Sequence, residues 1–296
     1  MKPHGWVGLV IMAAGEALLY AGVPLVAVFF TPLMWSGYIL LVDGWIAART
    51  GASWLTKRRR EFGFLAVLSV LAWLLFEVYN IKLANWAYVG MPPQAWVRDI
   101  GFLWSFATIT PAMFETADGL AAMRRPARLW PELAPPAASA AQMKHTAAWA
   151  VVGLASVALP PALPGWLAPY SFGLVWVGFI FLLEPALLQA GQPSMLRLWR
   201  AGQRRVVARW LVAGLLCGLL WELWNVQTLA HGGAGWLYTM PSLIHNLVFG
   251  LHYGKMPVAG LLGFPPFALE SFALYYFLRW VLRLEPLLPP VEQYTQ

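Results

Sequence analysis

The sequence predicts an all-α membrane protein, a polytopic helical bundle of about eight spans built as two parallel four-span repeats. Of its 296 residues, 60% are hydrophobic and only 11% are charged, with a mean hydropathy of +0.61. Charged residues make up about a quarter of an average soluble domain. In addition, several polar and aromatic motifs occur twice, once in each half and in the same order. Internal repetition of this kind indicates a duplicated structural unit.

Apolar segments of about 20 residues, the length that crosses a bilayer core, occur four times in each half. In the first repeat, residues 1–122, the expected spans are 6–27, 31–48, 63–82 and 100–122. In the second repeat, residues 145–296, they are 146–163, 170–190, 207–227 and 256–283. Residues 123–144 contain several arginines and prolines, which is typical of a connection between units. We expect this linker to be cytoplasmic.

Basic residues predict the orientation. Lys57-Arg-Arg-Arg60 lies between the second and third spans of the first half, and five arginines from Arg197 to Arg209 lie at the same place in the second. Loops rich in Lys and Arg face the cytoplasm. We therefore expect a multi-pass protein of a bacterial inner membrane with both termini cytoplasmic, and an even number of spans per unit makes the repeats parallel. The net charge of +7 is explained by these loops, so no nucleic-acid partner is expected.

Four motifs are duplicated, and three of them carry acidic residues inside apolar segments. They pair Trp35–Asp43 with Trp176–Glu184, Leu75–Asn80 with Leu220–Asn225, Trp86–Tyr88 with Trp236–Tyr238, and Pro111–Glu115 with Pro266–Glu270. An ionisable side chain in the middle of a bilayer costs about 2.5–3.5 kcal/mol on insertion scales. A duplicated carboxylate therefore indicates a site, a partner or a cavity.

The acidic and amide side chains of these motifs are the candidate catalytic residues. They are Glu222, Asn225, Glu270, Glu77, Asn80 and Glu115. Each Glu-x-x-Asn pair shares one helix face, and a Glu222→Gln substitution is expected to abolish activity without unfolding the protein. In the alternative interpretation the carboxylates only hydrogen-bond between helices and hold the bundle together. For Asp43 a further alternative is that it reaches the cytoplasmic surface.

The candidate substrate-binding residues follow the Glu-x-x-Asn pairs. They are Trp236, Tyr238, His245, His252, Trp86 and Tyr88. The aromatic residues among them fit an interfacial belt equally well.

The two halves differ in length. Between its Met-Pro and its later Pro element the second half has six more residues than the first, and its outer loops contain His231, His245 and His252. This asymmetry predicts a single site in the second half, with the histidines beside Glu222 and Glu270. A separation of seven residues would place His245 and His252 on one helix face about 10 Å apart, too far for one ion, so no metal site is predicted.

The order of these motifs resembles that of a known membrane family. The order Asn-x(5)-Trp-x-Tyr, a proline loop and a span with Pro-Phe-Ala-Leu-Glu270 resembles the duplicated integral-membrane lycopene cyclase domain, over the last half of each unit. This chain has four spans per unit rather than three, and a single Glu at Glu115 and at Glu270 where that family has an acidic pair. The resemblance implies acid-initiated chemistry on a polyisoprenoid, as in carotenoid biosynthesis, with Glu270 or Glu222 as proton donor.

The sequence favours an integral membrane enzyme that acts on a hydrophobic isoprenoid or lipid by carboxylate acid–base chemistry. Its expected partners are that substrate and the bilayer. Two alternatives stay open: a transporter or proton-coupled carrier with an intramembrane carboxylate pathway, and a non-catalytic assembly protein. No dinucleotide, P-loop, Cys-x-x-Cys or serine-hydrolase motif occurs, which leaves any cofactor unknown. A blind apolar pocket open to lipid would favour the enzyme, and a polar path between both faces would favour transport.

Overall fold

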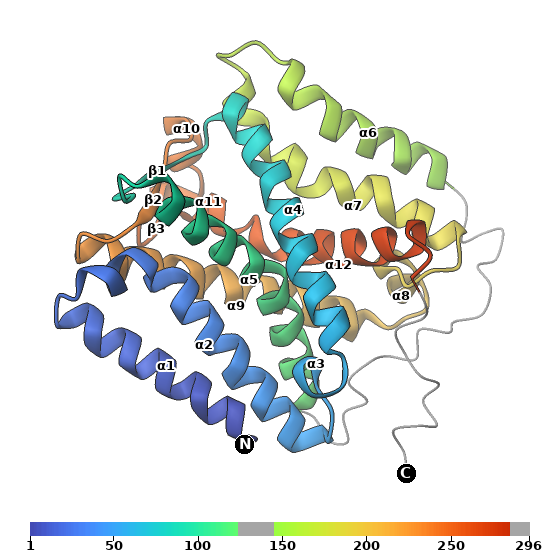
Figure 1. Ribbon diagram of the computed structural model, residues 1–296. Helices are drawn as coiled ribbons and strands as arrows, with labels where there is room; N and C mark the ends of the chain where they lie inside the picture. The colour runs from blue at the N-terminus through green and yellow to red at the C-terminus, as the bar shows by residue number, and fades with distance from the viewer. Residues whose placement is uncertain (124–144, 285–296) are drawn as a thin grey trace.

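A computed structural model describes residues 1–123 and 145–284. The predicted linker at 123–144 lies, after its first residue, outside the described residues. Within the described ranges the chain is a bundle of helices with two short antiparallel ribbons (Figure 1). This confirms the all-α prediction.

The elements of the two halves follow one another in a similar order. The first half contains α1 (Pro3–Tyr20), α2 (Pro24–Thr50), α3 (Trp54–Lys57), α4 (Arg59–Leu83), β1 (Trp86–Val89) and α5 (Ala95–Ala122). The second contains α6 (Thr146–Ala162), η1 (Ala168–Ser171), α7 (Phe172–Gln189), α8 (Met195–Arg200), α9 (Arg204–Ala230), β2 (Gly235–Tyr238), α10 (Ser242–His245), η2 (Val248–Gly250), β3 (His252–Tyr253), β4 (Met256–Pro257), α11 (Val258–Leu261) and α12 (Phe264–Val281).

Within residues 1–123 and 145–284, five helical segments are long and apolar enough to cross a membrane. They are Pro24–Thr50, Arg59–Leu83, Ala168–Gln189, Arg204–Ala230 and Val258–Val281. The prediction of a multi-pass membrane protein is compatible with these helices. The remaining predicted spans correspond to α1, α5 and the shorter apolar helix α6.

Two predicted span boundaries are wrong. The segment 6–27 is not one helix, because α1 ends at Tyr20, Gly22 adopts a φ of +75° and Pro24 begins α2. Proline fits the first turn of a helix, where no N–H is needed. The segment 256–283 is also divided: it begins with strand β4 and the short helix α11, and α12 then starts at Phe264 with prolines in its first turn.

The helices pack in a similar way in both halves. Helix α1 lies along α2, and α6 lies along α7, on opposite sides of the bundle (Figure 1). Glycines allow both close approaches, since a Cβ on Gly8 would meet the backbone of α2 and one on Gly153 would meet the backbone of α7. Small residues serve this purpose in membrane helix pairs. Between the two pairs, α5 contacts α2, α4 and α9, and α12 contacts α7, α9 and α5.

Asp43 and Glu184 anchor the short helices that follow their spans. Asp43 accepts hydrogen bonds from Ser53 Oγ (2.8 Å) and the amide of Leu55 (2.9 Å), at the start of α3. Glu184 accepts the equivalent bonds from Ser194 Oγ (2.6 Å) and Leu196 N (2.8 Å), at the start of α8. Asp43 is completely buried, so the expectation that it reaches the cytoplasmic surface is wrong. Its additional bond to His4 Nε2 (2.8 Å) also ties down α1.

Candidate functional site

The repeated Trp-x-Tyr motifs meet in one antiparallel ribbon. Strand β1 pairs with β2 so that Trp86 lies opposite Tyr238 and Tyr88 opposite Trp236. This pairing brings together two segments about 150 residues apart in sequence, which was not predicted. Residues of both halves therefore form one site rather than two.

The Asn of each Glu-x-x-Asn motif holds one strand of this ribbon. Asn80 donates from Nδ2 to Trp86 O (2.9 Å) and accepts from Trp86 N at Oδ1 (3.3 Å). Asn225 makes the same pair of bonds with Trp236, both at 3.0 Å. An amide side chain is suited to this role because it offers a donor and an acceptor side by side. The geometry explains why the Asn and the Trp recur together.

Glu77 lies at the centre of an aromatic donor set. Its Oε1 accepts hydrogen bonds from Trp73 Nε1 (2.9 Å), Trp86 Nε1 (3.1 Å) and the Tyr88 hydroxyl (2.6 Å). Its Oε2 has no hydrogen bond to any described residue, and the side chain is only half-buried. Trp73 was not among the predicted site residues. Its position four residues before Glu77, on the same helix face, was a usable signal.

Glu222, the counterpart of Glu77, is enclosed. It is completely buried, and its Oε1 accepts hydrogen bonds from the amides of Lys255 and Met256. Its Oε2 accepts from the Tyr238 hydroxyl (2.9 Å) and Asn225 Nδ2 (3.3 Å). The predicted contact between Glu222 and Asn225 is thus present. The additional residues of the second half close over this carboxylate.

Both tyrosines remain donors to their carboxylates. Burial, together with the neighbouring Glu77 carboxylate, raises the pKa of Tyr88 well above its ordinary value. Burial and Glu222 raise the pKa of Tyr238 in the same way. A charged phenolate is disfavoured in a low-dielectric site and next to a carboxylate. Each phenol therefore keeps its proton at neutral pH.

Three apolar cavities meet at Tyr88. The first, the ribbon cavity, has a volume of about 70 Å³ and is lined by Tyr88, Tyr238 and the tryptophans Trp73, Trp86, Trp176, Trp221 and Trp236, among others. The second, the α2–α5 cavity, has a volume of about 60 Å³ and shares Tyr88, Trp221 and Trp236 with the first.

The third cavity, the side cavity, opens between α4 and α5. It has a volume of about 430 Å³ and is lined by Glu77, Tyr88, Asp99 and four apolar side chains, of which Leu74 and Leu103 are 43% and 54% exposed. Exposed leucines on a membrane-type bundle face the region that lipid would occupy. Glu77 therefore stands where a lateral opening reaches the aromatic interior.

Glu115 and Glu270 lie apart from these cavities. Both side chains are completely buried. Neither carboxylate makes a geometrically well-formed hydrogen bond within residues 1–123 and 145–284. Asp43 lies next to the Glu115 carboxyl group, and Asp118 and Arg58 are its other charged neighbours. Neither Glu115 nor Glu270 lines any of the three cavities described above.

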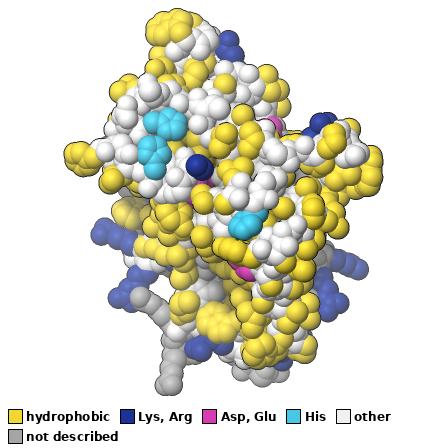
Figure 2. Space-filling model, turned by 90° about the vertical axis from the view of Figure 1, so that its left-hand side faces the viewer, with side chains coloured by type: hydrophobic (Ala, Val, Ile, Leu, Met, Phe, Trp, Pro, Cys, Tyr) yellow, Lys and Arg dark blue, Asp and Glu magenta, His cyan; other side chains and the backbone are white. Residues whose placement is uncertain are grey.

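The histidine geometry predicted from the sequence is wrong. His245 Nδ1 and His252 Nε2 are 3.2 Å apart rather than about 10 Å, because α10 is a single turn and the chain then reverses into β3. His231 instead packs on Tyr20 and bonds to Gln227 O (2.9 Å). Figure 2 shows histidine side chains on the face that carries the ribbon.

Glu222 and Glu270 are completely buried, whereas His245 is half-buried and His252 is exposed. Neither histidine lines any of the three cavities. Over the described ranges, no group of three or more His, Cys, Asp or Glu side chains could hold a metal ion.

No protein-family model, curated protein or solved structure matches this chain. The resemblance to the lycopene cyclase domain therefore rests on the order of the motifs alone. Any inference about function depends on the site geometry given above.

Proposed function

We propose that this protein is an integral membrane enzyme that acts on a hydrophobic isoprenoid or lipid substrate, with Glu77 as its acid–base residue. One observation carries the proposal: a carboxylate with one free oxygen lies where a lateral opening meets cavities walled by aromatic side chains. Apolar walls suit a hydrocarbon substrate, and a positioned carboxylate can transfer a proton to or from it.

The aromatic side chains near Glu77 have two roles, to orient its carboxyl group and to stabilise positive charge on the substrate. Trp73, Trp86 and Tyr88 all bind Oε1, which orients the carboxyl group and leaves Oε2 to exchange a proton with the substrate. The faces of the tryptophans in the ribbon cavity would stabilise positive charge that develops on the substrate after proton transfer, because an aromatic face attracts a cation. Tyr88, Trp73 and Trp86 are positioning residues in this scheme.

Glu77 is preferred to Glu222 because of access. Each carboxylate oxygen of Glu222 accepts two hydrogen bonds, and two of the four donors are backbone amides of the loop that covers it. Glu222 and Asn225 then support the β2 side of the shared cavity. In this scheme the reacting carboxylate, Glu77, belongs to the first half, and the second half covers and supports the site. The sequence had instead favoured a reactive site in the second half.

We also propose that the chain is a duplicated unit with about eight spans and cytoplasmic termini. The matched bonds of Asn80 and Asn225, and of Asp43 and Glu184, support the duplication. The basic loops support the orientation. Reporter fusions after Arg128 and after Arg283 should both give cytoplasmic signals, and a periplasmic signal from either one would exclude parallel four-span repeats.

Lipid analysis tests the enzymatic proposal. Extracts of a deletion strain should accumulate one apolar compound, and the wild-type gene should convert it. Glu77→Gln should restore no conversion at equal expression, whereas Glu16→Gln should restore it fully, because Glu16 bonds only to Gln227 and lies outside the cavities. Identical extracts from all four strains would contradict the proposal.

A second function, a proton-coupled carrier, is favoured by the buried carboxylates Glu115 and Glu270. Buried ionisable residues of membrane bundles often relay protons. In a carrier, Glu270→Gln and Glu115→Gln should both reduce transport, with Glu270 the more important. In the enzyme we propose, conversion should tolerate both substitutions better than Glu77→Gln.

A further inference from the structure

The α2 wall of the α2–α5 cavity is interrupted by a kink. Phe29 departs from helical geometry (φ −106°, ψ 17°), and Pro32 follows within the same helix. Proline has no N–H to donate to the carbonyl four residues earlier, here Val28. Val28, Phe29 and Pro32 all line the cavity, so the kink shapes this wall.

Two polar side chains on this wall lack partners. Thr31 Oγ1 and Trp35 Nε1 are buried without a hydrogen bond to any described residue, and both residues line the cavity. They are four residues apart on one helix, so they share a face one turn apart. Groups of this kind are nearly always hydrogen-bonded in folded proteins, and an exception requires an explanation.

The missing bonds have local causes. A helical threonine usually bonds to the carbonyl four residues before it, but Ala27 O already accepts from Thr228 Oγ1 (2.8 Å) and Ala234 N (3.3 Å). The rings around Trp35, from Tyr38, Trp221 and Trp224, present no acceptor within reach of its N–H. A molecule in the cavity, water included, can supply the acceptor.

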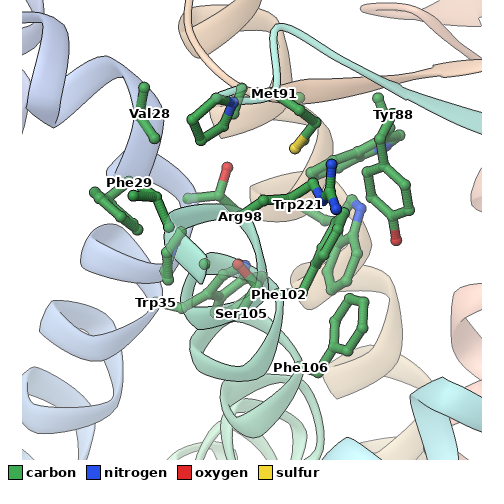
Figure 3. A pocket seen from close by; sticks show the side chains of 18 residues that line it. Val28, Phe29, Trp35, Tyr88, Met91, Arg98, Phe102, Ser105, Phe106 and Trp221 are labelled. Carbon is green, nitrogen blue, oxygen red and sulfur yellow. The ribbon is translucent and has the colours of Figure 1, made fainter. Parts of the chain in front are cut away.

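We propose that the α2–α5 cavity receives the oxygen-bearing end of the substrate, a hydroxyl or carbonyl group that accepts from Trp35 Nε1 and bonds to Thr31. Indole N–H groups only donate, so the ligand atom is an acceptor. Figure 3 shows Phe29 and Trp35 on the α2 side of the cavity, with Phe102 and Phe106 on the α5 side. The rest of the ligand is therefore hydrocarbon.

The ligand end is neutral rather than anionic. Arg98 is the one charged residue among those that line this cavity, and its side chain is 41% exposed with Asp99 beside it at 3.7 Å. The shared residues Tyr88, Phe102 and Phe106 place this cavity next to the side cavity that Glu77 lines. An oxygen held at Thr31 and Trp35 would thus leave the hydrocarbon chain on the side of Glu77. This orientation rests on the proposed function, but the binding of oxygen does not.

Equilibrium binding to the purified full-length protein in detergent tests the inference. The probes are radiolabelled geranylgeraniol and the matching hydrocarbon without the hydroxyl. Wild-type protein should prefer the alcohol. Trp35→Phe, which removes only the N–H donor and part of the ring, should weaken alcohol binding roughly two- to tenfold, the loss of one hydrogen bond, and leave hydrocarbon binding unchanged.

Two further variants complete the test. Thr31→Val keeps the shape of the side chain and should weaken the binding of the alcohol but not of the hydrocarbon. It provides an independent measurement if Trp35→Phe does not fold. Trp104→Phe is the matched control, because its N–H bonds to Ser36 Oγ (2.8 Å) outside the cavity, and it should change neither affinity.

The possible results separate this inference from the enzymatic proposal. Equal binding of the two probes by wild-type protein, or equal loss of both in Trp35→Phe and Thr31→Val, would overturn the assignment of an oxygen site. A preserved preference for the alcohol, combined with full conversion by Glu77→Gln cells, would instead remove Glu77 from the chemistry and leave the oxygen site standing.

Discussion

The two equivalent carboxylates should respond differently to the same substitution. In Glu222→Gln, one of the two oxygens is replaced by an NH2 group. Turned one way, this NH2 faces the backbone N–H groups of Lys255 and Met256; turned the other way, it faces Asn225 Nδ2 and the Tyr238 hydroxyl, which can rotate and accept. At least one donor is then left without an acceptor, and a buried donor of this kind costs about 1–3 kcal/mol. The substitution should therefore lower the free energy of unfolding by about 1–3 kcal/mol.

Glu77→Gln is the internal control. All three donors of Glu77 bind Oε1, and Oε2 has no described partner, so a Gln carbonyl at the Oε1 position keeps every bond. Loss of the negative charge is common to both variants. The difference in stability between them therefore isolates the donors at Glu222 that lose their acceptor.

Thermal unfolding of both variants in the same detergent measures this difference. Glu222→Gln should unfold at a clearly lower temperature than Glu77→Gln and should be cleaved sooner by protease in the 239–263 loop. This differs from the expectation from sequence that Glu222→Gln leaves the fold intact. Equal unfolding temperatures would refute the view that Glu222 holds the loop closed.

Three further predictions concern the ribbon and the helix ends. Asn225→Ala should cost about 2–4 kcal/mol by leaving backbone groups of a buried strand unpaired, and Asn80→Ala should cost less because Asn80 is only half-buried; urea titration compares them. Because the raised pKa values of Tyr88 and Tyr238 disfavour the phenolates in the folded protein, the stability that these two phenols contribute should be constant up to about pH 10, where unfolded phenols ionise, and should fall above it. Tyrosinate absorbance measured against pH tests this prediction. If all tyrosines of the folded protein ionised at the same pH, the pKa values of Tyr88 and Tyr238 would not be raised and the prediction would be wrong. Ser194→Ala should destabilise by about 0.5–2 kcal/mol through loss of the α8 cap, measured by thermal unfolding against wild type.

The sequence was sufficient to predict the fold class and the residues that lie close together within each motif. Apolar composition and segment length predict a helical membrane protein, and the recurrence of Glu77-x-x-Asn80 before Trp86 predicts a local unit, because residues close in sequence on one helix face must be close in space. It was not sufficient for the β1–β2 pairing. Nothing local in either strand indicates its partner, because the two strands are about 150 residues apart and meet only in the folded chain.

The same limit explains why the longer second half was misleading. An insertion next to a duplicated carboxylate is equally compatible with a loop that opens a site and with one that covers it, because sequence gives the length of a loop but not its direction. Here the chain turns back through α10 and β3, and the amides of Lys255 and Met256 reach Glu222. The equivalent stretch of the first half runs directly from β1 into the long helix α5, so Glu77 keeps a free oxygen beside the side cavity. Departure from symmetry therefore indicates where the two halves differ, and only the geometry of the carboxylates shows that the shorter half is the open one.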